Sequence, residues 1–134
     1  MTNSLYIPTS GPMNRPDSTE QAAKVLVEQA FDAPNVQVVT FTSSEFTSVC
    51  PITGQPDFGT VSIEYQPGAK CLESKSVKFY LWAYRNEGAF CESLAARIAD
   101  DVVSAIQPRH VKVTVVQTPR GGIGLTAVAE RSSE

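Results

Sequence analysis

The chain has 134 residues, of which 42% are hydrophobic and 19% charged, which suits one compact domain and leaves no room for a second. Its net charge of -3 lacks the basic excess of a nucleic-acid-binding surface, and no apolar run approaches the roughly 20 residues that span a bilayer. The N-terminus has no charged and apolar leader, and three cysteines cannot all pair with one another. We therefore expect a soluble cytoplasmic protein with reduced thiols, no membrane contact and no nucleic-acid partner.

The N-terminal residues 1–16 are polar, contain several prolines and show no periodic apolar pattern. This composition predicts a flexible arm, followed by a single domain over residues 17–134. Asp17 or Ser18 can cap a first helix, which the apolar spacing carries to about Ala30.

Two β-rich segments follow this helix. Residues 36–42 are β-branched and aromatic, and residues 59–65 alternate apolar and polar side chains, so we predict two strands paired as a hairpin. Residues 43–58 lie between them. About sixteen residues are too many for a tight turn, so this segment is predicted to be a functional loop.

The second half of the chain predicts two helices and then two strands. Residues 73–84 fit a helix or a strand, and we predict a helix; residues 92–106 repeat apolar side chains at helical spacing. Strands are expected at 110–116 and 123–129, joined by a glycine-containing turn at 117–122. The order is one helix followed by β-β-α-α-β-β, which predicts an α+β fold with helices on one face of an antiparallel sheet.

Cys50 is the first candidate for chemistry, because it lies among the turn residues of the predicted loop. A thiol becomes a nucleophile only when a base, a cation or a helix N-terminus favours its thiolate. Asp57, in the same loop, could move protons for it. The alternatives are a small buried cysteine and an aspartate that closes a turn.

Other polar residues give weaker signals. His110 is the only histidine, and no pair of cysteines or histidines has zinc-ligand spacing, so no metal is expected. Basic residues could hold phosphates, with an ordinary solvated surface as the alternative. These residues are Lys70, Lys75, Lys78, Arg85 and Arg120, the last being followed by two glycines.

Three motifs together are more specific: residues 50–57 (CPITGQPD), residues 73–80 (ESKSVKFY) and Arg120-Gly-Gly. In order and spacing they resemble the NADPH-dependent 7-cyano-7-deazaguanine reductases, the nitrile reductases of queuosine biosynthesis, over about residues 41–130. The resemblance implies a tunnelling fold, in which β-β-α-α-β-β subunits form a homo-oligomeric ring with sites between neighbours. A ring would also cover the open edges of a small sheet.

The resemblance also implies roles for individual residues. Cys50 matches the nucleophile that attacks the nitrile carbon to form a thioimide, Asp57 the proton donor, and Glu92 a carboxylate that binds the guanine-like edge. The substrate-contacting residues would be Leu72, Glu73, Ser74, Cys91 and Glu92. The NADPH-contacting residues would be Ser74, Lys75, Arg120 and Gly121.

Two positions depart from the family pattern, which reads Arg-Asn-His-Gly-x-Phe-His-Glu. Here Glu87 and Cys91 replace the two histidines. A thiol cannot substitute for imidazole near neutral pH, because its ordinary pKa is about two units higher. Since Cys50, Asp57 and Glu92 all remain, the sequence favours an active reductase.

The predicted function is reduction of 7-cyano-7-deazaguanine to 7-aminomethyl-7-deazaguanine with two NADPH. One alternative is a related enzyme in which ammonia attacks the same thioimide to give an amidine. Another is a purine-binding ring protein without catalysis, which the two missing histidines suggest. A zinc-dependent cyclohydrolase on the same fold is disfavoured, because its metal ligands are missing.

Overall fold

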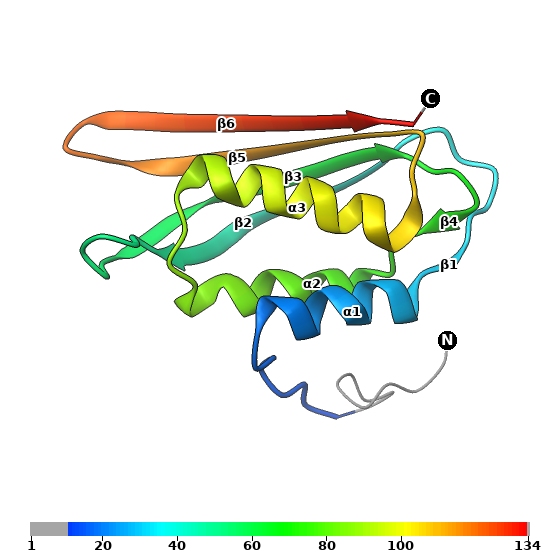
Figure 1. Ribbon diagram of the computed structural model, residues 1–134, viewed down its shortest axis with the longest axis horizontal. Coiled ribbons are helices and arrows are strands. Elements are labelled where there is room, and N and C mark those ends of the chain that lie inside the picture. The colour runs from blue at the N-terminus through cyan, green and yellow to red at the C-terminus, as the bar shows by residue number, and fades with distance from the viewer. Residues whose placement is uncertain (1–10, 134) are drawn as a thin grey trace.

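The computed structural model describes residues 11–133 and has two layers, a sheet and a set of helices that cover one face of it (Figure 1). The antiparallel sheet has the strand order β2-β3-β5-β6. Its strands are β2 (Val39–Val49), β3 (Pro56–Gln66), β5 (His110–Arg120) and β6 (Ile123–Ser132). The helices are α1 (Thr19–Gln29), α2 (Ser74–Trp82), the short 3₁₀ helix η1 (Ala83–Asn86) and α3 (Cys91–Ile106). The predicted order of one helix followed by β-β-α-α-β-β is confirmed.

The predicted helices form where the apolar spacing places them. Ser18 caps α1, because its hydroxyl accepts a hydrogen bond from the backbone N–H of Gln21 at 3.0 Å. On α3 the buried side chains recur at helical spacing, and the helix ends at Gln107 in the left-handed conformation. The ambiguous segment 73–84 is helical, as predicted.

The predicted loop at residues 43–58 is wrong, because most of it is strand. β2 continues to Val49 and β3 begins at Pro56, which leaves only residues 50–55 as the turn. A β-bulge between Ser43 and Phe46 shifts the register of this hairpin. The bulge interrupts the alternation of apolar and polar residues, and this interruption made the strand resemble a loop. The turn between β5 and β6 is likewise shorter than predicted.

A second, two-stranded sheet was not predicted. It pairs β1 (Phe31–Asp32) with β4 (Lys70–Cys71) beside the start of α2. Strands of two residues have no measurable periodicity, so no sequence pattern could indicate them.

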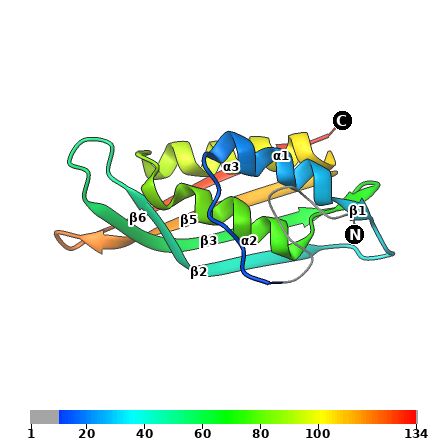
Figure 2. The ribbon, with the colours of Figure 1, turned by 90° about the horizontal axis from the view of Figure 1, so that it is seen from below.

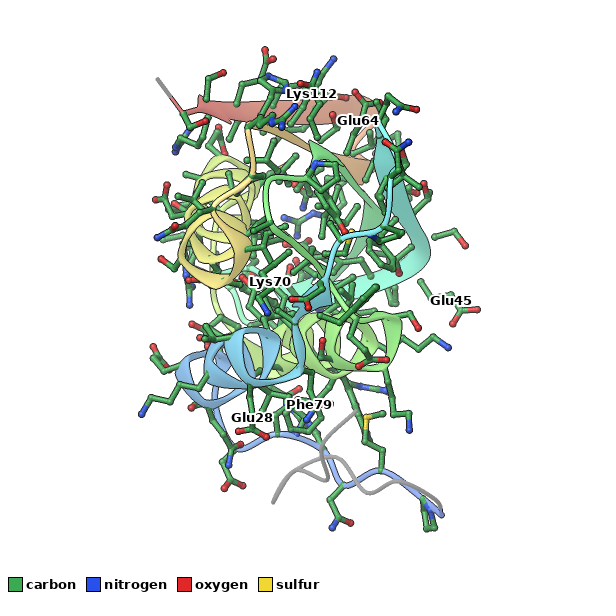
Figure 3. The ribbon with its side chains drawn as sticks, turned by 90° about the vertical axis from the view of Figure 1, so that its right-hand side faces the viewer. Glu28, Glu45, Glu64, Lys70, Phe79 and Lys112 are labelled. Carbon is green, nitrogen blue, oxygen red and sulfur yellow. The ribbon has the colours of Figure 1, made fainter. Side chains whose placement is uncertain are left out.

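The core lies between the sheet and the helices. Apolar side chains of β3 and β5 alternate toward the helices, as shown by Val61, Ile63, Val113 and Val115, all of which are buried. The intervening positions face away, and Glu64 and Lys112 lie opposite each other on this outer face (Figure 3). No helix in residues 11–133 is both long and apolar enough to cross a membrane.

The predicted N-terminal arm falls mainly on residues 1–10, which lie outside the described part of the chain. Residues 11–16 contain neither helix nor strand, and Met13 packs partly against the core. The flexibility of the arm and the single domain over 17–134 stay predictions.

Gly59 on β3 lies close against the backbone of β5. A Cβ atom at this position would lie 2.5 Å from the carbonyl oxygen of Val116 on β5. Because that neighbour is backbone and cannot rotate away, the β3–β5 pairing requires a glycine here.

We expect Gly59→Ala to lower the free energy of unfolding by about 1 to 3 kcal/mol, the usual cost of forcing extra atoms into a packed site. Urea denaturation would measure it. Gly124→Ala is the matched control, since its added Cβ would lie 3.8 Å from the Pro119 side chain and meet no backbone. Equal stability of the two variants would contradict the proposed constraint.

Candidate active site

Three segments that carry predicted site residues meet at one end of the molecule. They are the β2–β3 turn, the β5–β6 turn and the start of α3, all on the left of Figure 1. A β-bridge between Val49 and Gly88 ties the first hairpin to the segment before α3. The structure therefore brings together five of the predicted residues and Gly121 of the second turn. The five are Cys50, Asp57, Cys91, Glu92 and Arg120.

Cys50 begins the β2–β3 turn. Its backbone N–H donates to the carbonyl oxygen of Gln55 at 2.9 Å, and its own carbonyl oxygen accepts from the N–H of Gly54 at 2.9 Å. These bonds close the turn and leave the thiol half-buried at its edge. The backbone thus fixes the position of the sulfur while reagents can still reach it.

The surroundings of Cys50 favour its thiolate. The main cause is hydrogen bonding from Thr53, first from its hydroxyl and then from its backbone N–H, with a further contribution from the N–H of Ile52. The Arg120 side chain adds a smaller effect, and partial burial opposes all of them. Together they lower the pKa of Cys50 to about 7.

Asp57 lies on β3 and not in a turn, so the turn-closing alternative is wrong. Its side chain is only 9% exposed, and its Oδ1 lies 3.2 Å from Nη2 of Arg120. This contact is an ion pair without hydrogen-bond geometry, so Oδ1 has no hydrogen-bond partner among the described residues. A buried carboxylate oxygen that lacks a hydrogen-bond partner is costly and is typical of a group that acts on a ligand.

Cys91 shares a small pocket with Asp57 at the start of α3. Its Sγ donates to the carbonyl oxygen of Val115 at 3.6 Å. Burial raises the pKa of Cys91, and the negative charges of Glu92 and Asp57 raise it further. Cys91 is therefore a neutral thiol at neutral pH.

Glu87, the other departure from the family pattern, turns away from this pocket. Its carboxylate accepts from Nη1 of Arg97 on α3 at 3.0 Å, and the same guanidinium stacks over the ring of Tyr84. The charge of Glu87 thus stabilises the packing of the helices.

The remaining predicted residues, 72–75, lie at the opposite end of the molecule. The N–H of Leu72 donates to the hydroxyl of Tyr65, which lies eight positions after Asp57 on β3. At the usual rise of a strand, those positions span roughly 26 Å. One chain therefore does not bring the stretch from Leu72 to Lys75 to Cys50.

Leu72 and Glu73 also serve the fold. Leu72 is buried, and the Glu73 carboxylate caps α2 by accepting from the N–H groups of Lys75 at 2.7 Å and Ser76 at 2.8 Å. Ser74 is exposed and opens onto a groove of about 570 Å³ between α2 and the edge strand β2. In Figure 2 these two elements run side by side.

Sequence reasoning missed two groups near the site. Thr53, which does most to activate Cys50, could have been found from its position three residues later in a turn. Phe58 and Phe90 are each more than half exposed beside the site residues Asp57 and Cys91. Exposed aromatic rings next to polar groups suit a flat heterocyclic ligand.

Within residues 11–133 the structure groups no three His, Cys, Asp or Glu side chains that could hold a metal ion. His110 begins β5, and its Nε2 lies 2.9 Å from a carboxylate oxygen of Glu130 on the exposed surface.

The fold and the activated thiol define a tunnelling-fold protein equipped for cysteine chemistry. The chain belongs to the QueF-like protein family, whose model matches residues 56–134, more than half of its length. Asp57, Cys91, Glu92 and Arg120 fall within the match, and Cys50 lies six residues before it.

Relatives in three bacteria carry the name NADPH-dependent 7-cyano-7-deazaguanine reductase. The protein of Syntrophus aciditrophicus (strain SB) is 55% identical over 93 residues, 69% of this chain and 66% of that protein. That of Anaeromyxobacter sp. (strain K) is 51% identical, covering 67% of this chain and 73% of the relative. The protein of Streptococcus mutans serotype c is 49% identical, and the match covers 72% of this chain and 62% of that relative. The chain thus spans about two thirds of the length of these relatives.

A solved structure has the same fold. It is a crystal structure of the archaeosine synthase QueF-Like in the apo form, with a TM-score of 0.70 and 31% sequence identity. The match covers 75% of this chain and 99% of that one. The predicted α+β tunnelling fold is confirmed.

We expect iodoacetamide to modify Cys50 much faster than Cys71 or Cys91 at pH 7. The rate at Cys50 should rise with pH through about 7 and then level off, because deprotonation supplies the thiolate. Peptide mass spectrometry after timed alkylation would separate the three thiols. A rate at Cys50 that keeps rising beyond pH 8.5 would contradict the activated thiol.

Proposed function

We propose that the chain is an NADPH-dependent nitrile reductase of queuosine biosynthesis, which converts 7-cyano-7-deazaguanine to 7-aminomethyl-7-deazaguanine with two NADPH. The observation that carries the proposal is the Cys50 turn, where the pKa of Cys50 falls to about 7 and where Arg120 links the turn to the buried carboxyl group of Asp57. An activated thiol next to a proton donor is what covalent attack on a nitrile requires. The names of relatives about half identical to this chain support the same activity.

In the first step the thiolate of Cys50 attacks the nitrile carbon. A C–S bond forms, one π bond of the nitrile breaks, and the nitrogen takes the proton of the Asp57 carboxyl group to give a thioimide. Glu92, exposed in the first turn of α3, is available to accept hydrogen bonds from the guanine-like edge of the substrate. Phe58 and Phe90 offer faces for its flat ring.

NADPH, when bound, supplies the hydride for each of the two reductions. The residues proposed to bind it fit an anionic ligand. Arg120 is 48% exposed, and Gly121 and Gly122 follow it with φ of +61° and +80°, a conformation that favours glycine and opens the backbone N–H groups. Ser74, which is exposed, and the cationic Lys75 lie in the first turn of α2 and could contact phosphate through their side chains.

We further propose that a neighbouring copy completes the site in a homo-oligomeric ring. One copy would supply the residues around Cys50, and the other copy would supply the stretch from Leu72 to Lys75. Within a single subunit this stretch lies at the opposite end of the molecule from Cys50. In the described sheet, strands β2 and β6 have unpaired outer edges of eleven and ten residues. Long open edges favour pairing between copies, which would close a ring.

Ammonia-dependent amidine formation is the second candidate. The observation that keeps a synthase in consideration is the structural match to a protein named archaeosine synthase, which covers 75% of this chain with a TM-score of 0.70. The identity of 31% to that protein is well below the 49 to 55% identity to the reductases. The reductase is therefore the better supported assignment.

The two candidates differ in what consumes the thioimide. With nitrile and NADPH together, we expect nicotinamide absorbance to fall, with about two NADPH consumed per amine formed, because a nitrile needs two hydrides to become an amine. Cys50→Ala should abolish turnover and the adduct, while Cys71→Ala, which removes a buried thiol far from the Cys50 turn of the same chain, is the control for adduct formation. Amidine formation with ammonia and no NADPH oxidation would instead support the second candidate, and no adduct at all would support a binding protein.

The shared site predicts complementation between two inactive variants. Cys50→Ala loses the nucleophile and Lys75→Ala weakens cofactor binding, so each alone should be nearly inactive. When the two are co-expressed, about a quarter of the sites should combine an intact Cys50 with an intact Lys75 from the neighbour. Activity restored to about that level would support the shared site, while no restoration would place both residues in one chain.

A further inference from the structure

Arg120 contacts the Cys50 turn and Asp57 at the same time. Its Nη1 donates to Oε1 of Gln55 at 3.3 Å, and its Nη2 lies 3.2 Å from Oδ1 of Asp57. Gln55 closes the turn that Cys50 begins, and Arg120 makes a small contribution to the lowered pKa of the thiol. One cation from β5 thus contacts Asp57 and the turn that carries Cys50, the two groups of the proposed first step.

We propose that Arg120 is a positioning residue for covalent attack. It stabilises the one negative charge of this step, which lies on the Cys50 sulfur before the attack and on the Asp57 carboxylate after it. This inference rests on the proposed function. It assigns Arg120 a role in the step that needs no cofactor, in addition to the phosphate contact proposed above.

The charge balance of the step explains the need for such a cation. Before attack the productive form carries a thiolate and a carboxylic acid. Afterwards the sulfur is bonded to carbon and neutral, the nitrogen holds the proton, and the carboxylate carries the charge. A planar guanidinium has several N–H donors and can therefore face both the sulfur and the carboxylate. It can stay in place while the negative charge passes from one to the other.

No other described cation takes this position. The charged or titratable groups that face the step are Cys50 and Asp57 on the β2–β3 hairpin, Arg120 on β5, and Cys91 and Glu92 on α3. Cys91 is neutral at neutral pH, and neither Cys91 nor Glu92 can carry a positive charge. Arg120 is therefore the group in the described chain that can offset the charge.

The test compares Arg120→Gln, Arg120→Lys and wild type in adduct formation with 7-cyano-7-deazaguanine, without NADPH, over a range of pH. We expect Arg120→Gln to form the adduct about three to ten times more slowly at pH 7, with the half-maximal rate moved to higher pH, because the thiolate loses a cation. Arg120→Lys should restore the pH profile while remaining slower than wild type, since one ammonium cannot face both groups. Arg131→Gln is the matched control; Arg131 pairs with exposed Asp100 at 2.9 Å, outside the site.

Alkylation of Cys50 by iodoacetamide in the same variants needs no nitrile and separates the two proposals. If wild type forms no adduct, the proposed function fails, and the alkylation profile still tests Arg120. A pH profile in Arg120→Gln identical to wild type, for both adduct and alkylation, would overturn the inference.

Discussion

Strand β3 hydrogen-bonds to both β2 and β5, and this double pairing places the two hairpin turns at one end of the molecule. The pairing with β5 depends on Gly59, where any side chain would collide with the backbone at Val116. Gly59 lies two residues after Asp57. The register of the β3–β5 pairing that brings Gly59 close to Val116 therefore also places Asp57 near Arg120. The positions of the candidate site residues at this end of the molecule therefore depend on the register of the sheet.

Cys50 and Cys91 lie at the same end of the molecule, but their electrostatic surroundings shift their pKa values in opposite directions. Cys50 lies in a turn whose N–H and hydroxyl groups point at the sulfur, whereas Cys91 lies on a buried helical turn beside two carboxylates. The same functional group thus has a lowered pKa at one position and a raised pKa at the other. On the proposed function, Asp57 would supply the proton where Cys91 stands in place of a family histidine, since it lines the same pocket and its Oδ1 has no hydrogen-bond partner among the described residues.

Helices α1 and α3 could be predicted from the sequence because their apolar spacing is regular and Ser18 is a strong cap, whereas the pattern of residues 73–84 also fitted a strand. The strands were predicted too short, since the bulge after Ser43 breaks the alternation, and residues 43–58 looked like a loop. Cys50, Asp57 and Arg120 were identified from motifs. Their contact was not foreseeable, because it depends on the pairing of β3 with β5 across 63 positions of sequence between Asp57 and Arg120. Nor could the motifs reveal that residues 72–75 lie at the other end.

The closure of the β2–β3 turn has a consequence for the chain before assembly. The groups that do most to activate Cys50 come from its own six-residue turn, so a lone subunit already has a reactive sulfur. On the proposed shared site, such a subunit would lack the neighbour that completes the pocket around it. A half-exposed thiolate of this kind is the form most readily oxidised to sulfenic acid. Assembly would then shelter the nucleophile as well as complete the site, so newly made and dissociated subunits would be the most sensitive to peroxide.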